Sequence, residues 1–421
     1  MVRMSIGSLP GNTQEKASLG RLTDTTSGKF RRVFSRRAVC CGLLLLTATT
    51  WLSAQVQDQV FESGTPTRCS ILSVSRDSLR VSDKGQQREI PVNTIRKVVV
   101  GNEPNELKTA RDRIRDGRYE DALALLQKLD PASVKRDLVK RDVAYLKALV
   151  PARLAMSTSG DKKRAHDALL GFIKSNPQTH HYYEAAQVLG DLSMSQENYE
   201  ASARYYAAIA NAPWEDYQMR ALVLQARAQL AQGSFAAALA SFEKVGSSAG
   251  NTPVALDQKL EAAIGKAVCL AEKAQAAAGL QIVQQVISEN DYGQKPAVFA
   301  RAYNALGRCH LASKNPKEAL LAFLHVHLLP KLRSADADAH AEALYHLGKL
   351  WAQVNQPDRA VKATSLLKTR YAGSVWASKK GEPAAARTGA CSATFPGMRF
   401  PGALPNLTTV YTITGRLSER H

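Results

Sequence analysis

Residues 299–326, FARAYNALGRCHLASKNPKEALLAFLHV, decide the fold. Apolar residues recur at every third or fourth position on both sides of a short polar turn that contains Asn315 and Pro316. That period places the apolar side chains on one face of each of two helices. The stretch therefore predicts a helix, a turn and a second helix.

The same pattern recurs along the chain, at residues 105–128, 218–245 and 340–367. A small residue late in the first helix is followed twelve positions later by a small residue in the second helix, and a bulky residue usually stands four positions further on. Small side chains are needed where two helices cross closely, and a bulky apolar residue fills the space one turn away. The pairs of small residues are Ala110 and Ala122, Gly190 and Ser202, Ala226 and Ala238, Ala267 and Gly279, Gly307 and Ala319, and Gly348 and Ala360.

These units resemble the tetratricopeptide repeat (TPR), and the resemblance covers residues 105–376. It implies a helical solenoid in which stacked neighbours supply the core that a single repeat lacks. A unit at residues 143–177 fits less well, because Pro151 and Arg153 stand where small or apolar residues are expected and residues 156–161 lengthen the turn. Successive units are spaced more widely than the usual period of about 34 residues, so longer helices or loops are expected. The predicted fold is an all-α solenoid of about seven repeats.

Residues 65–101 have a different pattern and predict a small β module ahead of the repeats. Short β-type runs alternate with turn signals, of which Asp83-Lys84-Gly85 is the clearest, and they indicate three to four strands in hairpin succession. So short a segment cannot bury a core alone, so the module is expected either to pack on the helices that follow or to pair with something else. The combination of module and repeats resembles exported proteins of planctomycete-type bacteria, which implies a fold and no activity.

The N-terminus, residues 1–54, has the features of an export signal. A basic cluster ends at Arg36 and Arg37, and the apolar run Ala38–Ala54 follows it and closes on small residues. The run is short for a membrane span, so a cleaved signal peptide is expected, with an uncleaved N-terminal anchor as the alternative. The arginine pair fits either a twin-arginine or a general secretory signal. The expected location is the periplasm or cell envelope, with membrane contact only if the N-terminal helix is retained.

Residues 377–421 are expected to be a mostly disordered tail, because they are rich in Gly, Pro, Ala, Ser and Thr without a helical period. More than half of the net charge of +19 lies in this tail and in residues 1–37. The repeats show no basic stripe interleaved with aromatic residues. The high net charge is therefore only a weak argument for nucleic-acid binding, and no nucleic-acid partner is expected.

The sequence lacks the common catalytic and metal-binding motifs, so no enzyme, no cofactor and no metal site is expected. His325 and His327 are two positions apart on a helix and point in different directions. His180 and His181 are interpreted as surface residues between repeats.

Cys269 and Cys309 occupy equivalent positions in successive units. Neighbouring helix axes lie about 8–10 Å apart, which is too far for a disulfide, so two buried free thiols are expected.

In TPR proteins the first helices line a concave face that binds extended peptides, and this chain places polar residues at the corresponding positions. Arg220 and Arg227 are two helical turns apart and share a face, and Arg301 and Arg308 repeat this arrangement. Guanidiniums in such a row suit the carboxylates of an acidic segment or of a peptide C-terminus. The expected peptide-binding residues are Gln187, Asp191, Arg220, Arg227, Arg301, Asn304, Arg308, Tyr345 and Lys349.

The sequence thus predicts a non-catalytic protein–protein interaction scaffold of the cell envelope, with other proteins as its partners. The alternative is an accessory subunit of an envelope enzyme or transporter complex, anchored by the N-terminal segment.

Overall fold

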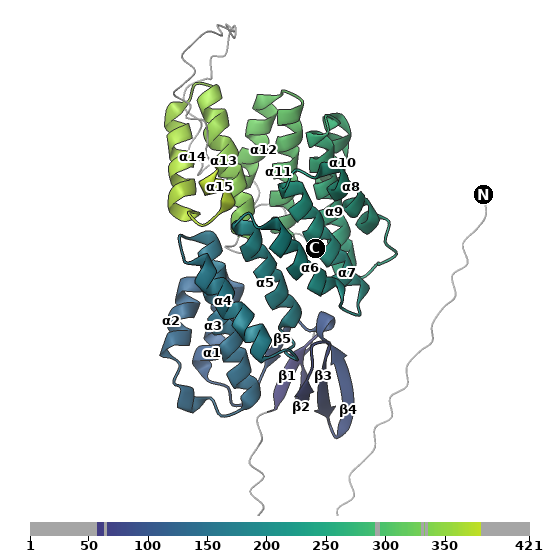
Figure 1. The fold of residues 1–421 in the computed structure, drawn as a ribbon, viewed down its shortest axis with the longest axis vertical. Helices are drawn as coiled ribbons and strands as arrows, with labels where there is room; N and C mark the ends of the chain where they lie inside the picture. Colours follow the sequence, from purple (N-terminus) through teal and green to yellow (C-terminus); the bar gives the residue numbers. More distant parts are fainter. Residues whose placement is uncertain (1–56, 63–64, 291–294, 330–331, 333–335, 380–421) are drawn as a thin grey trace, which may run out of the picture. The chain divides into compact units, whose positions relative to one another are not determined.

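The computed structural model describes residues 57–62, 65–290, 295–329, 332 and 336–379 (Figure 1). The predicted signal peptide or anchor and nearly all of the predicted tail lie outside the described residues. Among the described helices, none is long and apolar enough to cross a membrane.

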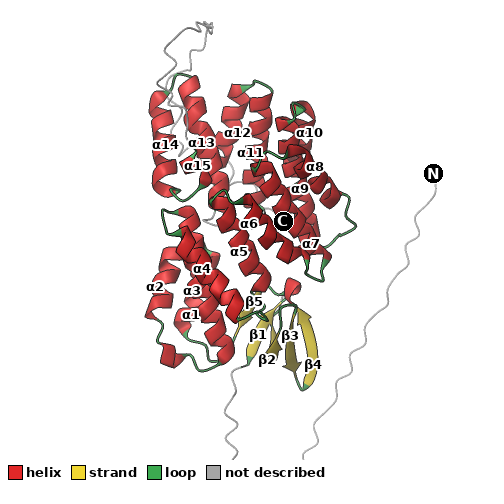
Figure 2. Cartoon of the chain, in the orientation of Figure 1, coloured by secondary structure: helices red, strands yellow, loops and turns green. Residues whose placement is uncertain are grey.

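Fourteen helices form seven consecutive helix pairs, which confirms the predicted all-α repeat fold (Figure 2). Each helix packs most closely on the helices before and after it in the sequence. The pairs are α1 (Asn105–Arg115) with α2 (Tyr119–Lys128), α3 (Asp137–Ser157) with α4 (Lys162–Ser175), α5 (Tyr182–Ser195) with α6 (Tyr199–Ala210), α7 (Glu215–Ala231) with α8 (Phe235–Gly246), α9 (Pro253–Glu272) with α10 (Ala276–Glu289), α11 (Pro296–Ala312) with α12 (Pro316–Leu328), and α13 (Ala337–Gln353) with α14 (Pro357–Arg370). A short helix α15 (Val375–Ser378) follows.

The small residues of each pair lie where the two helices cross, as the sequence predicts. A Cβ added at Gly190 on α5 would lie 2.2 Å from the ring of Tyr206 on α6, and one added at Gly307 would lie 2.6 Å from the ring of Phe323. Both aromatic side chains are buried. The bulky residue of the second helix therefore fills the space that the small residue of the first helix leaves open.

The turn inside most repeats is closed by one residue in the left-handed backbone region. Gly117 and Gly233 adopt this conformation without a steric clash. A residue with a Cβ atom adopts it only with backbone strain. The equivalent positions of other repeats hold Glu197, Ala274, Lys314 and Asn355.

The β module is a five-stranded antiparallel sheet in the order β4-β3-β2-β1-β5, in which β1 to β4 form a meander and β5 crosses back to pair with β1. Its strands are β1 (Asp58–Phe61), β2 (Thr67–Val74), β3 (Ser78–Asp83), β4 (Gln86–Pro91) and β5 (Lys97–Val99), with a 3-10 helix (Val92–Thr94) before the last. The predicted turn joins β3 to β4, with Lys84 and Gly85 at positive φ. The sheet has one strand more than the three to four expected, because the short segment β1 carries no clear alternation.

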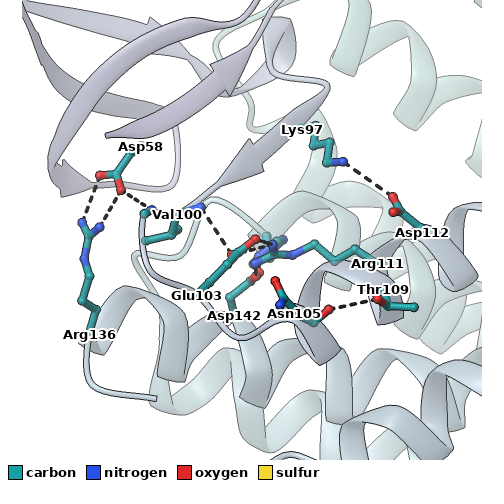
Figure 3. Close-up of polar contacts among 12 residues, drawn as sticks. Asp58, Lys97, Val100, Glu103, Asn105, Thr109, Arg111, Asp112, Arg136 and Asp142 are labelled. Carbon is teal, nitrogen blue, oxygen red and sulfur yellow. Dashed lines mark hydrogen bonds and ion pairs between the residues drawn. The ribbon is translucent and has the colours of Figure 1, made fainter. Parts of the chain in front are cut away.

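The module packs on the repeats, as its small size requires. The indole of Trp214, at the start of α7, packs against the module's buried core, and the Tyr183 hydroxyl of α5 donates to Asp77 Oδ1 at 2.7 Å. On β1, the buried Asp58 carboxylate accepts two hydrogen bonds from Arg136, which precedes α3 (Figure 3). The contacts thus reach the beginnings of α3, α5 and α7.

Candidate functional site

The first helices of successive repeats are joined by ion pairs along the predicted peptide-binding face. Glu261 on α9 accepts from Arg227 on α7 at 2.5 Å and from Arg301 Nε on α11 at 2.9 and 3.0 Å. The Glu261 side chain is 10% exposed, whereas the side chains of Arg227 and Arg301 are 37% and 30% exposed. The guanidiniums lower the pKa of this buried carboxyl although burial alone would raise it.

A second set of contacts joins α9, α11 and α13. Arg308 pairs with Glu272 at 2.6 Å and lies 3.6 Å from Glu342. Asn304 is buried and donates to the Ala339 carbonyl at 2.8 Å and to Glu342 at 3.1 Å. Burial raises the pKa of Glu342 to about 7, outweighing the nearby guanidinium.

Asp191 on α5 contacts side chains of two other helices, α3 and α6. It lies 3.5 Å from the Arg153 guanidinium of α3 and accepts from the Tyr206 hydroxyl at 2.9 Å. Gln187, one turn earlier, has a buried Oε1 atom without a hydrogen-bond partner among the described residues. Arg153 breaks the repeat pattern in the sequence, and this ion pair accounts for its presence.

The remaining predicted residues lie against aromatic rings. The Arg220 guanidinium is 5.7 Å from the centre of the Tyr217 ring, and the Lys349 ammonium is 4.5 Å from that of Tyr345. Such cation–π contacts contribute about 0.5–1 kcal/mol where they are exposed.

The segment after α14 returns to the same face of α13. The Gly373 amide donates to the Ser157 carbonyl at the end of α3 at 3.3 Å, and the Ser374 hydroxyl donates to Asp338 at 3.3 Å. The Trp376 ring centre lies 5.4 Å from that of Tyr345, with the Lys379 ammonium 3.8 Å above the indole. The last repeat therefore contacts the second one.

The structure places all nine predicted residues on first helices, and it pairs the guanidiniums of Arg227, Arg301 and Arg308 with carboxylates of the chain itself. Sequence reasoning did not identify those carboxylates, because their partners lie in neighbouring repeats. Both predicted thiols, Cys269 and Cys309, are buried and free, and burial raises the pKa of each to about 11.

A second polar cluster, which the sequence did not reveal, lies beneath the β module. The buried Asp142 of α3 accepts from His181 Nε2 at 2.7 Å and from Arg111 of α1 (Figure 3). The Arg111 guanidinium is held in turn by Glu103 at 2.7 Å. Burial raises the pKa of Asp142, but His181 and Arg111 lower it more, so the carboxyl titrates well below its ordinary range.

His180 lies beside this cluster but does not share its hydrogen bonds. Its ring centre is 3.8 Å from that of His181, and burial lowers its pKa to about 3. Its Nδ1 atom is buried without a hydrogen-bond partner among the described residues. An unsatisfied buried polar group costs about 1–3 kcal/mol and requires an explanation. The only sequence signal was the adjacent pair of histidines, because Asp142 is far away along the chain.

No family model matches this chain, and no curated protein matches it. Among solved structures it is similar to a Rap protein in complex with competence and sporulation factor, with 17% identity over 64% of this chain and 76% of the other and a TM-score of 0.41. It is also similar to a tetratricopeptide repeat protein from Parabacteroides merdae, with 13% identity over 63% and 91% of the two chains and a TM-score of 0.40. A third similarity is to PilW, a type IV pilus biogenesis factor, with 14% identity over 55% and 96% of the chains and a TM-score of 0.33. The function proposed below therefore rests on this chain's own residues.

Proposed function

We propose that this chain is a non-catalytic protein–protein interaction scaffold of a bacterial cell envelope, and that it binds extended peptide segments along the first helices of its repeats. The observation that carries the proposal is the polar face on α7, α9, α11 and α13, whose helices are linked by ion pairs. Ion pairs between successive repeats hold its side chains in fixed positions, which lowers the entropy that a peptide would otherwise lose in ordering them.

The envelope location rests on the basic and apolar segment at residues 1–54. A mature protein that begins near Gln55 supports the scaffold, whereas an intact N-terminus in the membrane fraction supports the anchored accessory subunit. N-terminal sequencing of the native protein separates the two.

The partner is proposed to carry acidic side chains or a C-terminal carboxylate. Because Glu261 already pairs with both Arg227 and Arg301, a partner carboxylate competes with it for those guanidiniums. Arg220 and Lys349 instead lie over aromatic rings and are the cations best placed to receive a new carboxylate.

The test is co-purification from native envelopes with a C-terminally tagged chain. Reversing Arg220 and Lys349 to Glu should abolish capture of the specific partner without breaking any ion pair described above. Lys362→Glu, at an exposed position on the second helix α14, is the matched control and should capture the partner normally. Equal capture of the partner by the unmodified chain, the Arg220→Glu/Lys349→Glu chain and the Lys362→Glu chain would refute binding on this face.

A further inference from the structure

Three ligand atoms for a metal ion converge beneath the β module. One atom each from Asp142, His180 and His181 lies within 4.8 Å of the others. Zinc holds nitrogen and oxygen ligands at about 2.0–2.2 Å, which separates tetrahedral ligand atoms by about 3.4 Å. Small side-chain movements are therefore enough to bring all three atoms to one ion.

The surroundings orient two of these ligands. Arg111 engages Asp142 Oδ2 and leaves Oδ1 directed at His181 Nε2. The His181 ring is stacked on the Tyr145 ring, with centres 3.9 Å apart. Groups that fix the rotamer of a metal ligand in this way are a regular feature of metal sites.

The third ligand group, His180, has a ring nitrogen that no hydrogen bond of the cluster satisfies. Its Nδ1 is buried and unpartnered among the described residues, whereas Arg111 donates to Glu103 and Asp142, and Asp142 also pairs with His181. A bound ion is one of the few ways to satisfy such an atom.

Charge also fits a cation. Glu103 and Asp142 carry two negative charges against the single positive charge of Arg111, so with neutral imidazoles the cluster has a net charge of −1. Two imidazoles and one carboxylate suit zinc and neighbouring transition ions rather than magnesium or calcium, which prefer oxygen ligands. The ion takes the place of the hydrogen between Asp142 Oδ1 and His181 Nε2.

We propose that Asp142, His180 and His181 bind a divalent ion of the zinc class, which ties α3 to the beginning of α5. Three protein ligands leave a fourth position for water. The site is separate from the peptide-binding face proposed above and does not depend on it.

The test uses the untagged chain, made metal-free with a chelator and titrated with Zn²⁺ by calorimetry and with Co²⁺ by visible absorption. One saturating equivalent of Zn²⁺, a tetrahedral Co²⁺ spectrum and a Zn²⁺-dependent rise in Tm are expected. His180→Ala removes one ligand and keeps the pairing of Asp142 with Arg111 and His181, so the metal-free variant should still fold, which circular dichroism checks. Its Zn²⁺ affinity should fall about 100-fold or more, at the upper end of the losses known for altered metal sites.

His325→Ala is the matched control, because that ring stacks on Tyr303 far along the chain from the cluster. It should bind Zn²⁺ like the unmodified chain. Absence of one-to-one binding in the unmodified chain, or equal affinity of the His180→Ala chain, would overturn the proposal. Several weak equivalents that persist in both variants would show adventitious binding only and would overturn it as well.

Discussion

Replacing Gly190 by alanine tests whether the helix crossing depends on a missing side chain. The new Cβ would lie 2.2 Å from Cε1 of Tyr206, well inside contact distance. That ring is buried, and its hydroxyl is held by Asp191, so it cannot swing aside without losing a hydrogen bond. Overpacking costs about 1–3 kcal/mol, and the better helix propensity of alanine returns about 1 kcal/mol. We expect a net loss of up to about 2 kcal/mol in the free energy of unfolding.

Gly171→Ala supplies the matched control within α4. There a Cβ would meet no atom within 4 Å, so the same substitution should stabilise the chain by about 0.5–1 kcal/mol. Urea unfolding followed by circular dichroism and by tryptophan fluorescence measures both, and agreement of the two signals checks that the transition is two-state. In Gly190→Ala/Tyr206→Leu the smaller side chain should recover part of the loss. The reasoning is refuted if Gly190→Ala is as stable as Gly171→Ala.

Four further predictions follow from the described contacts. Glu261→Gln should destabilise the chain by about 1–3 kcal/mol, because Arg227 loses its carboxylate partner while Arg301 keeps Asp336 at 3.8 Å and solvent reaches both arginines, and an unchanged urea midpoint would contradict this. Burial raises the pKa of Glu342 from 4.5 to about 7, so its contribution to stability is fully present below pH 4.5 and is lost as the pH rises through 7. Glu342→Gln should remove this pH dependence of the free energy of unfolding. Ala274→Gly should stabilise the turn after α9 by about 1 kcal/mol by relieving a positive φ, measured as a rise in Tm. Cys269 and Cys309 should react with a thiol reagent only after unfolding, and fast labelling of either residue in the native chain, located by peptide mapping, would disprove its burial.

The local pattern of the sequence predicted most of the fold because a repeat is built from local contacts. The spacing of small residues identified the crossings, and Asp83-Lys84-Gly85 identified the β3–β4 turn. The strand β1 was missed because four residues carry little periodicity, and its partners β2 and β5 give it its structure.

The candidate site was predictable only in part. Helical spacing was enough to place Arg227 and Arg301 on the predicted peptide-binding face of their helices. It could not show that both side chains reach Glu261. That contact depends on the stacking of whole repeats, which sequence spacing does not specify. The approach of Asp142 to His181 has the same origin, because the register between α3 and α5 brings the two side chains together.

The contact between Gly373 and Ser157 bears on how this array unfolds. In an open array each unit touches only its neighbours, so the ends fray first and the loss of structure spreads inward. Here the last unit also rests on the second, and a side chain at Gly373 would collide with the Thr158 carbonyl at 1.9 Å. Fraying at the C-terminal end must therefore break a bond to a remote unit, which should make the unfolding of the terminal repeats more cooperative. Because this contact joins distant parts of the chain, it carries a large loop-closure entropy and should form late in folding.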